Sequence, residues 1–449
     1  MRGRRKHRGI SAGTVVMLLL TACVAAGLMI VLPQLAGNTQ VTIDTGKVLG
    51  SLSLGGLLPE LSLSDIPIQA QVTQAPVKDS AGTAPTLTAA PTLQPALMDT
   101  AAPVQTGGSF TVALGGSLMI QSDVRKSAYV DEAGTYDFSE MISLLTPDMQ
   151  ADLCMVSLEN LVDPTAKLSD TVTSDQVIAM LPASGVDAVA LGFPKAYDQG
   201  MTGLANTINA LSGKGITVLG AFSDASDAQA VRLMTLGGVK VAALHYTDSL
   251  TSAGAKKMKK EDTAYAVPLA DGAAIVADMA KARQAGADVI IVSLNWGADN
   301  KTAPTKAQKA LAQQLADGGA DVIVGTGTGT VQPVTWLEGK RADGSAKQTL
   351  CAYSLGSLMT DSRSAANVAG MLLQLRIAVD QNGEVIFEKA NYAPTYIWKS
   401  KQDGQVHYRA LPSDRTAPDG MSKDQQTAMA KALKTVQTML DGSPLTLRE

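Results

Sequence analysis

The chain has 449 residues, of which 45% are hydrophobic and only 4% are aromatic, so we expect a core built mainly from aliphatic side chains and methionine. The formal net charge is −4, and a basic cluster at the N-terminus makes the remainder more acidic than this figure suggests. A domain that acidic is poorly suited to nucleic acid, which argues against that class of partner.

The first predicted element is a helix that crosses a membrane. Residues 9–32 contain no charged side chain, and about 20 apolar residues in a helix span the hydrocarbon layer. The basic residues at positions 1–8 are expected to remain in the cytoplasm as a short tail, because positive charge is retained on that side. We therefore predict a single-pass signal anchor in the cell membrane, with the C-terminal part of the chain outside the cytoplasm.

Two alternatives to the signal anchor stay open. A cleaved signal peptide has an apolar stretch of about 7–15 residues, which is shorter than this one. The run from Leu20 to Cys23 resembles a bacterial lipobox, in which the cysteine is lipidated, although apolar residues continue after Cys23. All three interpretations place the following domain outside the cytoplasm.

Residues 33–107 are predicted to form a disordered spacer. They are rich in Pro, Thr, Ala, Gln and Ser, and such a composition cannot bury enough apolar surface to offset the entropy lost on ordering. We expect them to form an extended link between the membrane and the folded domain.

From residue 108 onward, short apolar strands alternate with amphipathic helices. The predicted strands lie at 110–114, 153–158, 187–191, 216–219, 231–236, 239–245, 289–294, 322–324, 331–337, 349–354, 371–379 and 384–389, and the helices at 138–145, 174–181, 203–211, 273–285, 305–316 and 423–440. Gly237 and Gly238 separate two of these strands and predict a hairpin. The pattern favours an α/β fold at 108–400, a layered sandwich of mixed β-sheets flanked by helices, with a C-terminal extension and helix at 401–449.

The loops that follow the predicted strands are the expected location of a functional site, because ligands of open α/β sheets bind at the carboxyl ends of strands. Six of these segments have a distinctive sequence, namely 115–119 (GGSLM), 157–160 (SLEN), 191–200 (LGFPKAYDQG), 295–297 (NWG), 325–330 (GTGTGT) and 353–358 (YSLGSL).

In order and spacing, these six segments resemble the capsule-synthesis protein CapA family, also called the poly-γ-glutamate capsule family. The family pattern has Gly-Asp after the first strand and Asn-Leu-Glu after the second. It continues with Asn-Asn-His, Asp-x-Gly, His-Trp-Gly, Gly-His-His-Pro-His and Tyr-Ser-Leu-Gly-Asn-Phe. The resemblance covers residues 108–398. It implies a fold like that of the calcineurin-like metallophosphatases and a role in producing capsule or poly-γ-glutamate.

The chain departs from this pattern at most of the implied metal-ligand positions. The residues that replace the family's own are Gly116, Ser157, Pro194, Lys195, Asn295 and the run Thr326 to Gly329. Only Glu159 keeps a strong ligand, and the histidines of the chain, His7, His245 and His407, fall outside the motifs. A dinuclear site needs several carboxylate or imidazole ligands for each metal, so we predict no metal and no other cofactor.

Three residues stay as candidates for chemistry. Glu159 is either a hydrogen-bonded residue at a strand end or a catalytic base, and Asn295 is a weak ligand at best. Lys195 is either a solvated surface side chain or a cation that holds an anionic ligand. His245 ends an apolar strand, which is typical of a core histidine with satisfied hydrogen bonds.

The loop of alternating glycine and threonine has two interpretations. Successive backbone N–H groups of a glycine-rich loop can bind an anion, which would make Gly325, Thr326, Gly327, Thr328 and Gly329 ligand-binding residues together with Lys195. The loop lacks the Lys-Ser/Thr ending of a P-loop, so a former metal loop refilled with small residues is the other interpretation.

The sequence therefore predicts a membrane-anchored, non-catalytic binding module in the production of capsule or poly-γ-glutamate. Its expected partner is an anionic surface polymer or another envelope protein. The alternative is a hydrolase or transferase, metal-independent or weakly metal-dependent, that acts on an anionic polymer through Glu159, Lys195 and Asn295. Cys154 and Cys351 lie in predicted core strands, either as two buried thiols or as a disulfide.

Overall fold

The computed structural model describes residues 106–448, apart from 342–343 and 403. The predicted basic tail, the membrane helix, Cys23 and nearly all of the spacer lie outside the described residues. Within the described part of the chain, every helix is too short or too polar to cross a bilayer.

The first of two large sheets has nine strands, in the order β18-β17-β16-β1-β4-β7-β8, with β15 beside β1 and β19 beside β17. Their bounds are β1 Thr106–Leu118, β4 Leu153–Leu158, β7 Ala188–Ala190, β8 Thr217–Leu219, β15 Ser357–Met359, β16 Ala369–Asp380, β17 Val385–Gln402, β18 Gln405–Pro412 and β19 Thr446–Leu447. β1 is central in this sheet, since Val112 pairs with Leu153 of parallel β4 on one side and with Leu375 of antiparallel β16 on the other.

The second large sheet has six strands, in the order β13-β14-β12-β11-β10-β9. Their bounds are β9 Met234–Leu236, β10 Val239–Thr247, β11 Val289–Asn295, β12 Val322–Thr326, β13 Val334–Lys340 and β14 Ala346–Ala352. The inner strands β10, β11, β12 and β14 are parallel, and the edge strands β9 and β13 are antiparallel. The predicted hairpin at Gly237 and Gly238 is confirmed, with both residues at positive φ between β9 and β10.

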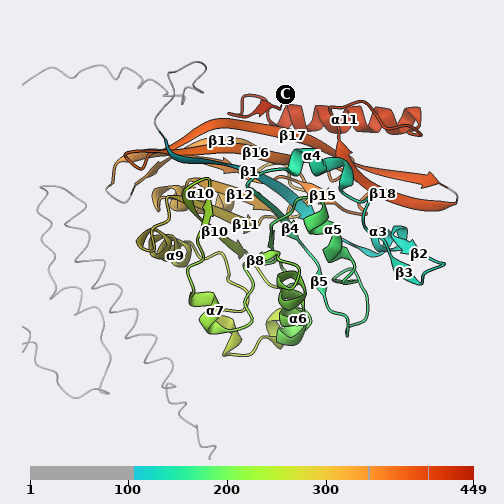
Figure 1. Ribbon diagram of the computed structural model, residues 1–449, viewed down its shortest axis with the longest axis horizontal. Coiled ribbons are helices and arrows are strands. Elements are labelled where there is room, and N and C mark those ends of the chain that lie inside the picture. Colours follow the sequence, from blue (N-terminus) through green and yellow to red (C-terminus); the bar gives the residue numbers. More distant parts are fainter. Residues whose placement is uncertain (1–105, 342–343, 403, 449) are drawn as a thin grey trace, which may run out of the picture. The chain divides into compact units, whose positions relative to one another are not determined.

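The two sheets pack face to face, and helices cover their outer faces (Figure 1). The helices are α3 Ser122–Ser127, α4 Thr146–Met149, α5 Val177–Ala183, α6 Gly200–Ser212, α7 Ala225–Gln229, α8 Ser252–Lys257, α9 Gly272–Gln284, α10 Lys306–Asp317 and α11 Lys423–Met439. Short 3₁₀ turns lie at Ser143–Leu145 and Asp262–Ala264, and short strand pairs join β2 Tyr129–Val130 to β3 Thr135–Tyr136 and β5 Leu161–Val162 to β6 Val172–Thr173.

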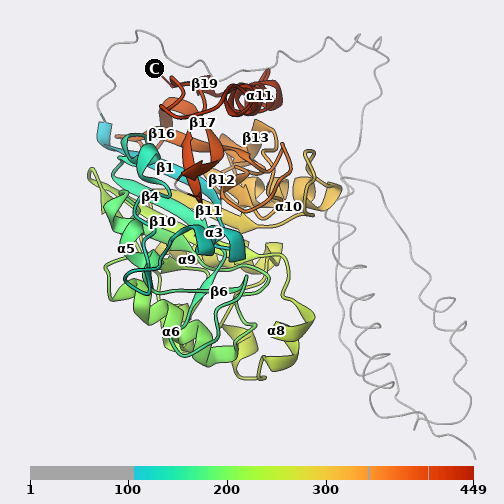
Figure 2. The same cartoon turned by 90° about the vertical axis from the view of Figure 1, so that its right-hand side faces the viewer.

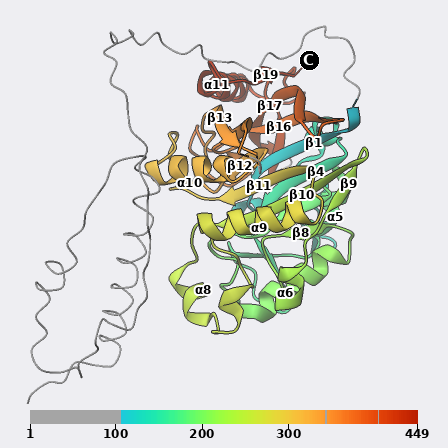
Figure 3. The same cartoon turned by 90° about the vertical axis from the view of Figure 1, so that its left-hand side faces the viewer.

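Alternating side chains explain why the inner strands are apolar throughout. In β11, Val289 and Ile291 pack with residues of the first sheet, whereas Ile290 and Val292 pack with residues of α9 and α10. These two helices lie beside the second sheet (Figure 3). Strands buried on both faces read as continuous apolar runs, which is the pattern that predicted them. α5 and α6 cover the outer face of the first sheet, and α11 lies along β16 and β17 (Figure 2).

The predicted mixed α/β sandwich is confirmed, but several predicted elements differ from the structure in their bounds. The helix expected at 138–145 is a 3₁₀ turn at Ser143–Leu145 followed by α4, which begins at Thr146 because Pro147 suits a first helical turn. The strand expected at 384–389 continues as β17 to Gln402. Residues 401–449 were expected to form an extension with a helix. They contribute β18 and β19 to the first sheet, and α11 packs on β16 and β17 of that sheet.

The two described cysteines are free thiols buried in separate clusters. Cys154 of β4 packs under the helices of the first sheet, and Cys351 of β14 packs under α9 and α10. Burial raises the pKa of the Cys154 thiol to about 12 and also raises the pKa of Cys351, so both are inert core residues.

Candidate functional site

The carboxyl ends of parallel strands from both sheets meet at one edge of the sandwich. There the Asn295 amide donates to Glu159 Oε1 at 3.0 Å, and the Thr326 hydroxyl donates to Ser157 Oγ at 3.3 Å. The Gly327 N–H donates to Ser117 Oγ at 3.4 Å. We call Ser117, Ser157, Glu159, Asn295, Thr326 and Gly327 the strand-end network. Each of its three bonds joins the first sheet to the second.

Glu159 is the only carboxylate in the strand-end network, and it is partly buried. Burial raises its pKa, while hydrogen bonds from the Ser117 hydroxyl and the Asn295 amide act to lower it. The charge of Asp299 adds to the increase in the pKa of Glu159, and the charge of Lys195 opposes it. The geometry agrees with the interpretation of Glu159 as a hydrogen-bonded residue at a strand end.

Lys195 lies in the loop after β7, where its side chain is exposed. Its charge acts on Glu159, so the structure places it at the same edge as the strand-end network. Lys195 forms no ion pair with any residue that the structure describes. Asn295 contacts Glu159 directly, and the charge of Lys195 acts on Glu159. The roles of all three residues stay predictions.

The glycine–threonine loop reaches the same edge, but hydroxyl groups of its threonines already form hydrogen bonds within the protein. Thr328 Oγ1 donates to Ser354 Oγ at 2.9 Å, and Thr330 Oγ1 donates to the Lys301 carbonyl at 2.7 Å. Gly327 and Gly329 take positive φ values of 96° and 71°, which favour glycine. Only backbone N–H groups of this loop could contribute to the predicted anion site.

Two glycines at this edge leave no room for a side chain. A Cβ atom on Gly116, which replaces the aspartate of the family pattern, would lie 2.1 Å from the Gly356 carbonyl oxygen. A Cβ atom on Gly325 would lie 2.0 Å from the Tyr353 carbonyl oxygen. The backbones of the neighbouring segments therefore occupy the space that larger side chains would need.

The residues at this edge do not fit a dinuclear metal centre. The strand-end network offers one carboxylate, one amide and hydroxyl groups, whereas such a centre needs several carboxylates or imidazoles. Across residues 106–448, with the gaps given above, no three His, Cys, Asp or Glu side chains lie close enough to hold a metal ion.

His245 near the end of β10 is a core residue with both ring nitrogens bonded. Nε2 lies 2.7 Å from the Gly192 carbonyl oxygen, which can only accept, so Nε2 carries the hydrogen. Nδ1 then accepts from the Ser293 hydroxyl at 3.0 Å. Burial lowers the pKa of His245 to about 4, so the ring stays neutral at neutral pH. The interpretation as a satisfied core histidine is confirmed.

This histidine gives a prediction for the pH dependence of stability. The ordinary pKa of 6.5 applies in the unfolded chain, which takes up a proton before the folded chain does as the pH falls. Stability present above about pH 6.5 is therefore lost toward about pH 4. Between pH 7 and pH 5, we expect the unfolding free energy of the wild type to fall by about 2 kcal/mol more than that of His245→Gln.

Urea unfolding of the full chain at several pH values measures this difference. Because the substitution also disturbs packing, the comparison uses the slope against pH rather than the absolute stability. Parallel pH profiles for the two proteins would show that His245 does not titrate differently on unfolding.

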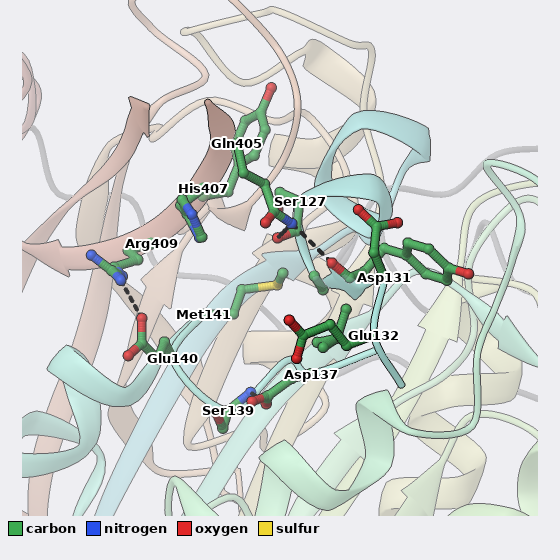
Figure 4. A pocket seen from close by; sticks show the side chains of 14 residues that line it. Ser127, Asp131, Glu132, Asp137, Ser139, Glu140, Met141, Gln405, His407 and Arg409 are labelled. Atoms are coloured by element: carbon green, nitrogen blue, oxygen red, sulfur yellow. Dashed lines mark hydrogen bonds and ion pairs between the residues drawn. The ribbon is translucent and has the colours of Figure 1, made fainter. Parts of the chain in front are cut away.

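A separate cavity of about 540 Å³ shares no residue with the strand-end network. It lies between the loop of β2 and β3 and the strand β18, with Asp131, Glu132 and Asp137 on one side (Figure 4). Glu140 is neutralised there by an ion pair with Arg409. Hydrogen bonds from Ser139 lower the pKa of Asp137, so this cavity has an acidic lining.

Sequence reasoning included Ser117 only within the segment 115–119 and did not single out Asp299. Ser117 lies near the end of β1, and Asp299 follows the Asn-Trp-Gly segment by two residues. Their positions at strand ends are the signal that could have found them.

The sequence matches the family "Bacterial capsule synthesis protein PGA_cap" over residues 111–362. It is 27% identical to the PGA biosynthesis protein CapA of Bacillus subtilis over 194 residues, 43% of this chain and 47% of that protein. It is 25% identical to the capsule biosynthesis protein CapA of Bacillus anthracis over 217 residues, 48% of this chain and 49% of that protein. The aligned part of the chain thus spans about half the length of these curated relatives.

Among solved structures, the chain is similar to a calcineurin-like phosphoesterase from Bacillus subtilis, with a TM-score of 0.39 and 12% sequence identity. The superposition covers 75% of this chain and 98% of that one. The family match, in contrast, covers more than half of the sequence and includes all six strand-end segments. The chain therefore belongs to the family of bacterial capsule synthesis proteins.

Proposed function

We propose that this protein serves the production of an anionic surface polymer of the poly-γ-glutamate type, and that it does so by binding rather than by catalysis. Family membership supports the role in capsule synthesis. The observation that carries the non-catalytic part is the strand-end network, in which hydrogen bonds between the two sheets occupy the edge where the family motifs meet. We also propose that the layered sheets form a metallophosphatase-like fold, as the family resemblance implies.

The proposed location is the outer side of the cell membrane. Residues 9–32 would anchor the chain as a single-pass helix, with residues 33–107 as a spacer and the folded domain outside the cytoplasm. Lipidation of Cys23 is the alternative form of attachment. The proposed partners are the anionic polymer itself or another envelope protein, with Lys195 and the backbone of residues 325–330 as an anion site.

The non-catalytic proposal predicts the metal content of the purified full chain. We expect less than about one equivalent of Mn, Fe or Zn and no hydrolysis of phosphate esters, because the donors needed for a dinuclear centre are missing. Elemental analysis and an ester assay with added metal measure both quantities. Glu159→Gln is the matched variant, and its metal content should equal that of the wild type.

The same preparation tests the alternative of an enzyme that acts on an anionic polymer. Glutamate polymer incubated with the full chain should keep its length distribution, whether or not Glu159 is replaced. Polymer shortening that disappears in Glu159→Gln, or stoichiometric metal with metal-dependent turnover, would contradict the non-catalytic proposal.

A further inference from the structure

A cavity of about 250 Å³ lies where four segments meet, shortly after the segment 353–358 along the chain. These are the loop at residues 360–368, the strands β17 and β18, and the helix α11. The Ile397 N–H donates to the Val368 carbonyl, which attaches the loop to β17 just before the first residue of β16. The Gln425 amide donates to the Lys399 carbonyl at 2.8 Å and attaches the first turn of α11 to the same strand.

Three of these four segments each contribute one cation to this cavity. Arg363 comes from the loop, Lys399 from β17 and Lys431 from α11. None of the three forms an ion pair with another described residue. Asp361 is the one acidic residue among those that line the cavity. The lining is thus net positive in a chain whose formal net charge is −4.

The three cations line open space, and one of them also contacts an aromatic ring. Lys399 Nζ lies 5.0 Å from the centroid of the Tyr408 ring, and this cation–π contact keeps the ammonium group beside the cavity. Ala428 and Ala432 line the cavity on the same helix face as Lys431, and their short side chains leave room for a ligand.

Tyr408 provides a second, independent observation. It lines the cavity and is only 5% exposed, and its buried hydroxyl group has no hydrogen-bond partner in the part of the chain that the structure describes. A buried hydroxyl without a partner is unfavourable, and buried polar groups in native proteins nearly always have one.

We infer that this cavity binds neighbouring carboxylates of an anionic polymer, with Arg363, Lys399 and Lys431 as their charge partners. Asp361 offsets only part of the charge of the three cations, and successive carboxylates of one polymer can neutralise the remainder. Charge-assisted hydrogen bonds to carboxylates are among the stronger polar contacts. The choice of a polycarboxylate rests on the proposed function, and the site itself rests on the geometry.

Titration of the full chain with a short γ-glutamate oligomer at low salt tests the inference. We expect the triple variant R363Q/K399Q/K431Q to bind at least about tenfold more weakly, because three charge-assisted contacts are lost. Lys434→Gln, an exposed lysine on the same helix that does not line the cavity, is the matched control and should bind like the wild type. Lys431→Arg keeps the charge and should retain most of the affinity.

Several outcomes would overturn the inference. These are equal affinity of the triple variant and the wild type, an equal loss in Lys434→Gln, or competition by inorganic phosphate as strong as that by the oligomer. A loss of oligomer affinity in Lys195→Ala alone would indicate that the polymer binds at the strand-end edge. That result would contradict binding in the cavity and would leave the proposed function intact. Thermal unfolding of each variant confirms that these surface substitutions leave the fold unchanged.

Discussion

Replacing Asp321 with alanine is expected to lower the free energy of unfolding by about 3–5 kcal/mol, because it leaves two buried or half-buried cations without an anion. Asp321 Oδ2 accepts from Arg283 Nη2 at 2.6 Å and from the Ile290 N–H at 2.7 Å. Its Oδ1 accepts from Lys347 Nζ at 2.5 Å. The Asp321 side chain is 2% exposed and that of Lys347 is 8% exposed, so water cannot replace the lost contacts.

Urea unfolding of the full chain measures this loss. Glu388→Ala is the matched control, because the Arg376–Glu388 ion pair has a similar distance of 2.7 Å but exposed partners. Exposed pairs contribute about 0–1 kcal/mol, so the control should remain close to the wild type. Burial lowers the pKa of Lys347, so loss of its proton would offset part of the cost in the Asp321 variant at high pH. Equal stability of the two variants would show that the buried pairs contribute no more than a surface pair.

Restoring the family's aspartate at position 116 is expected to destabilise the protein by about 3 kcal/mol or more, rather than to restore a metal site. A Cβ atom on Gly116 would lie 2.1 Å from the Gly356 carbonyl oxygen and 2.9 Å from its carbon. Both are backbone atoms, so a rotamer change cannot relieve the contact, and β1 must move away from the segment before β15.

Gly107→Asp is the matched control for this substitution. Gly107 lies in the same strand, and a Cβ atom there would have its closest neighbour at 3.5 Å, which is ordinary contact. Urea unfolding and metal analysis of the two variants should show a large loss of stability for Gly116→Asp alone and no gain of metal for either. A Gly116→Asp protein with wild-type stability, or with bound metal, would show that the segments can separate at low cost.

The strands and helices of the inner layers could be predicted because the pattern of their apolar residues shows which faces are buried. The strand Leu153–Leu158 has the predicted bounds, β11 ends one residue later than predicted, and α10 is shifted by one residue at both ends. These segments are apolar on every face that packs, so their periodicity carries the information. β17 and β18 were predicted poorly or not at all because Lys399, Lys401 and Gln402 are exposed, and these strands depend on pairing with each other.

The location of the strand-end network could be predicted from the sequence, but its hydrogen-bond partners could not. The rule that ligands bind at strand ends placed Glu159 and Asn295 at one edge, although 136 residues separate them. The sequence could not reveal that Ser117 and Thr326 complete the hydrogen bonds there, because those contacts exist only once the two sheets have packed. The cavity with Arg363, Lys399 and Lys431 left no local pattern, since one cation comes from each of three elements.

The central position of β1 determines when the first sheet can be completed during synthesis. β4 follows β1 closely and can pair with it early, but β16 is made much later, as the hydrogen bond between Arg376 and Ser109 across 267 residues shows. Until β16 has emerged, one edge of β1 exposes unpaired N–H and C=O groups that other chains can join. Slow or interrupted translation would therefore reduce the yield of folded protein through aggregation, even where the stability of the finished molecule is unchanged.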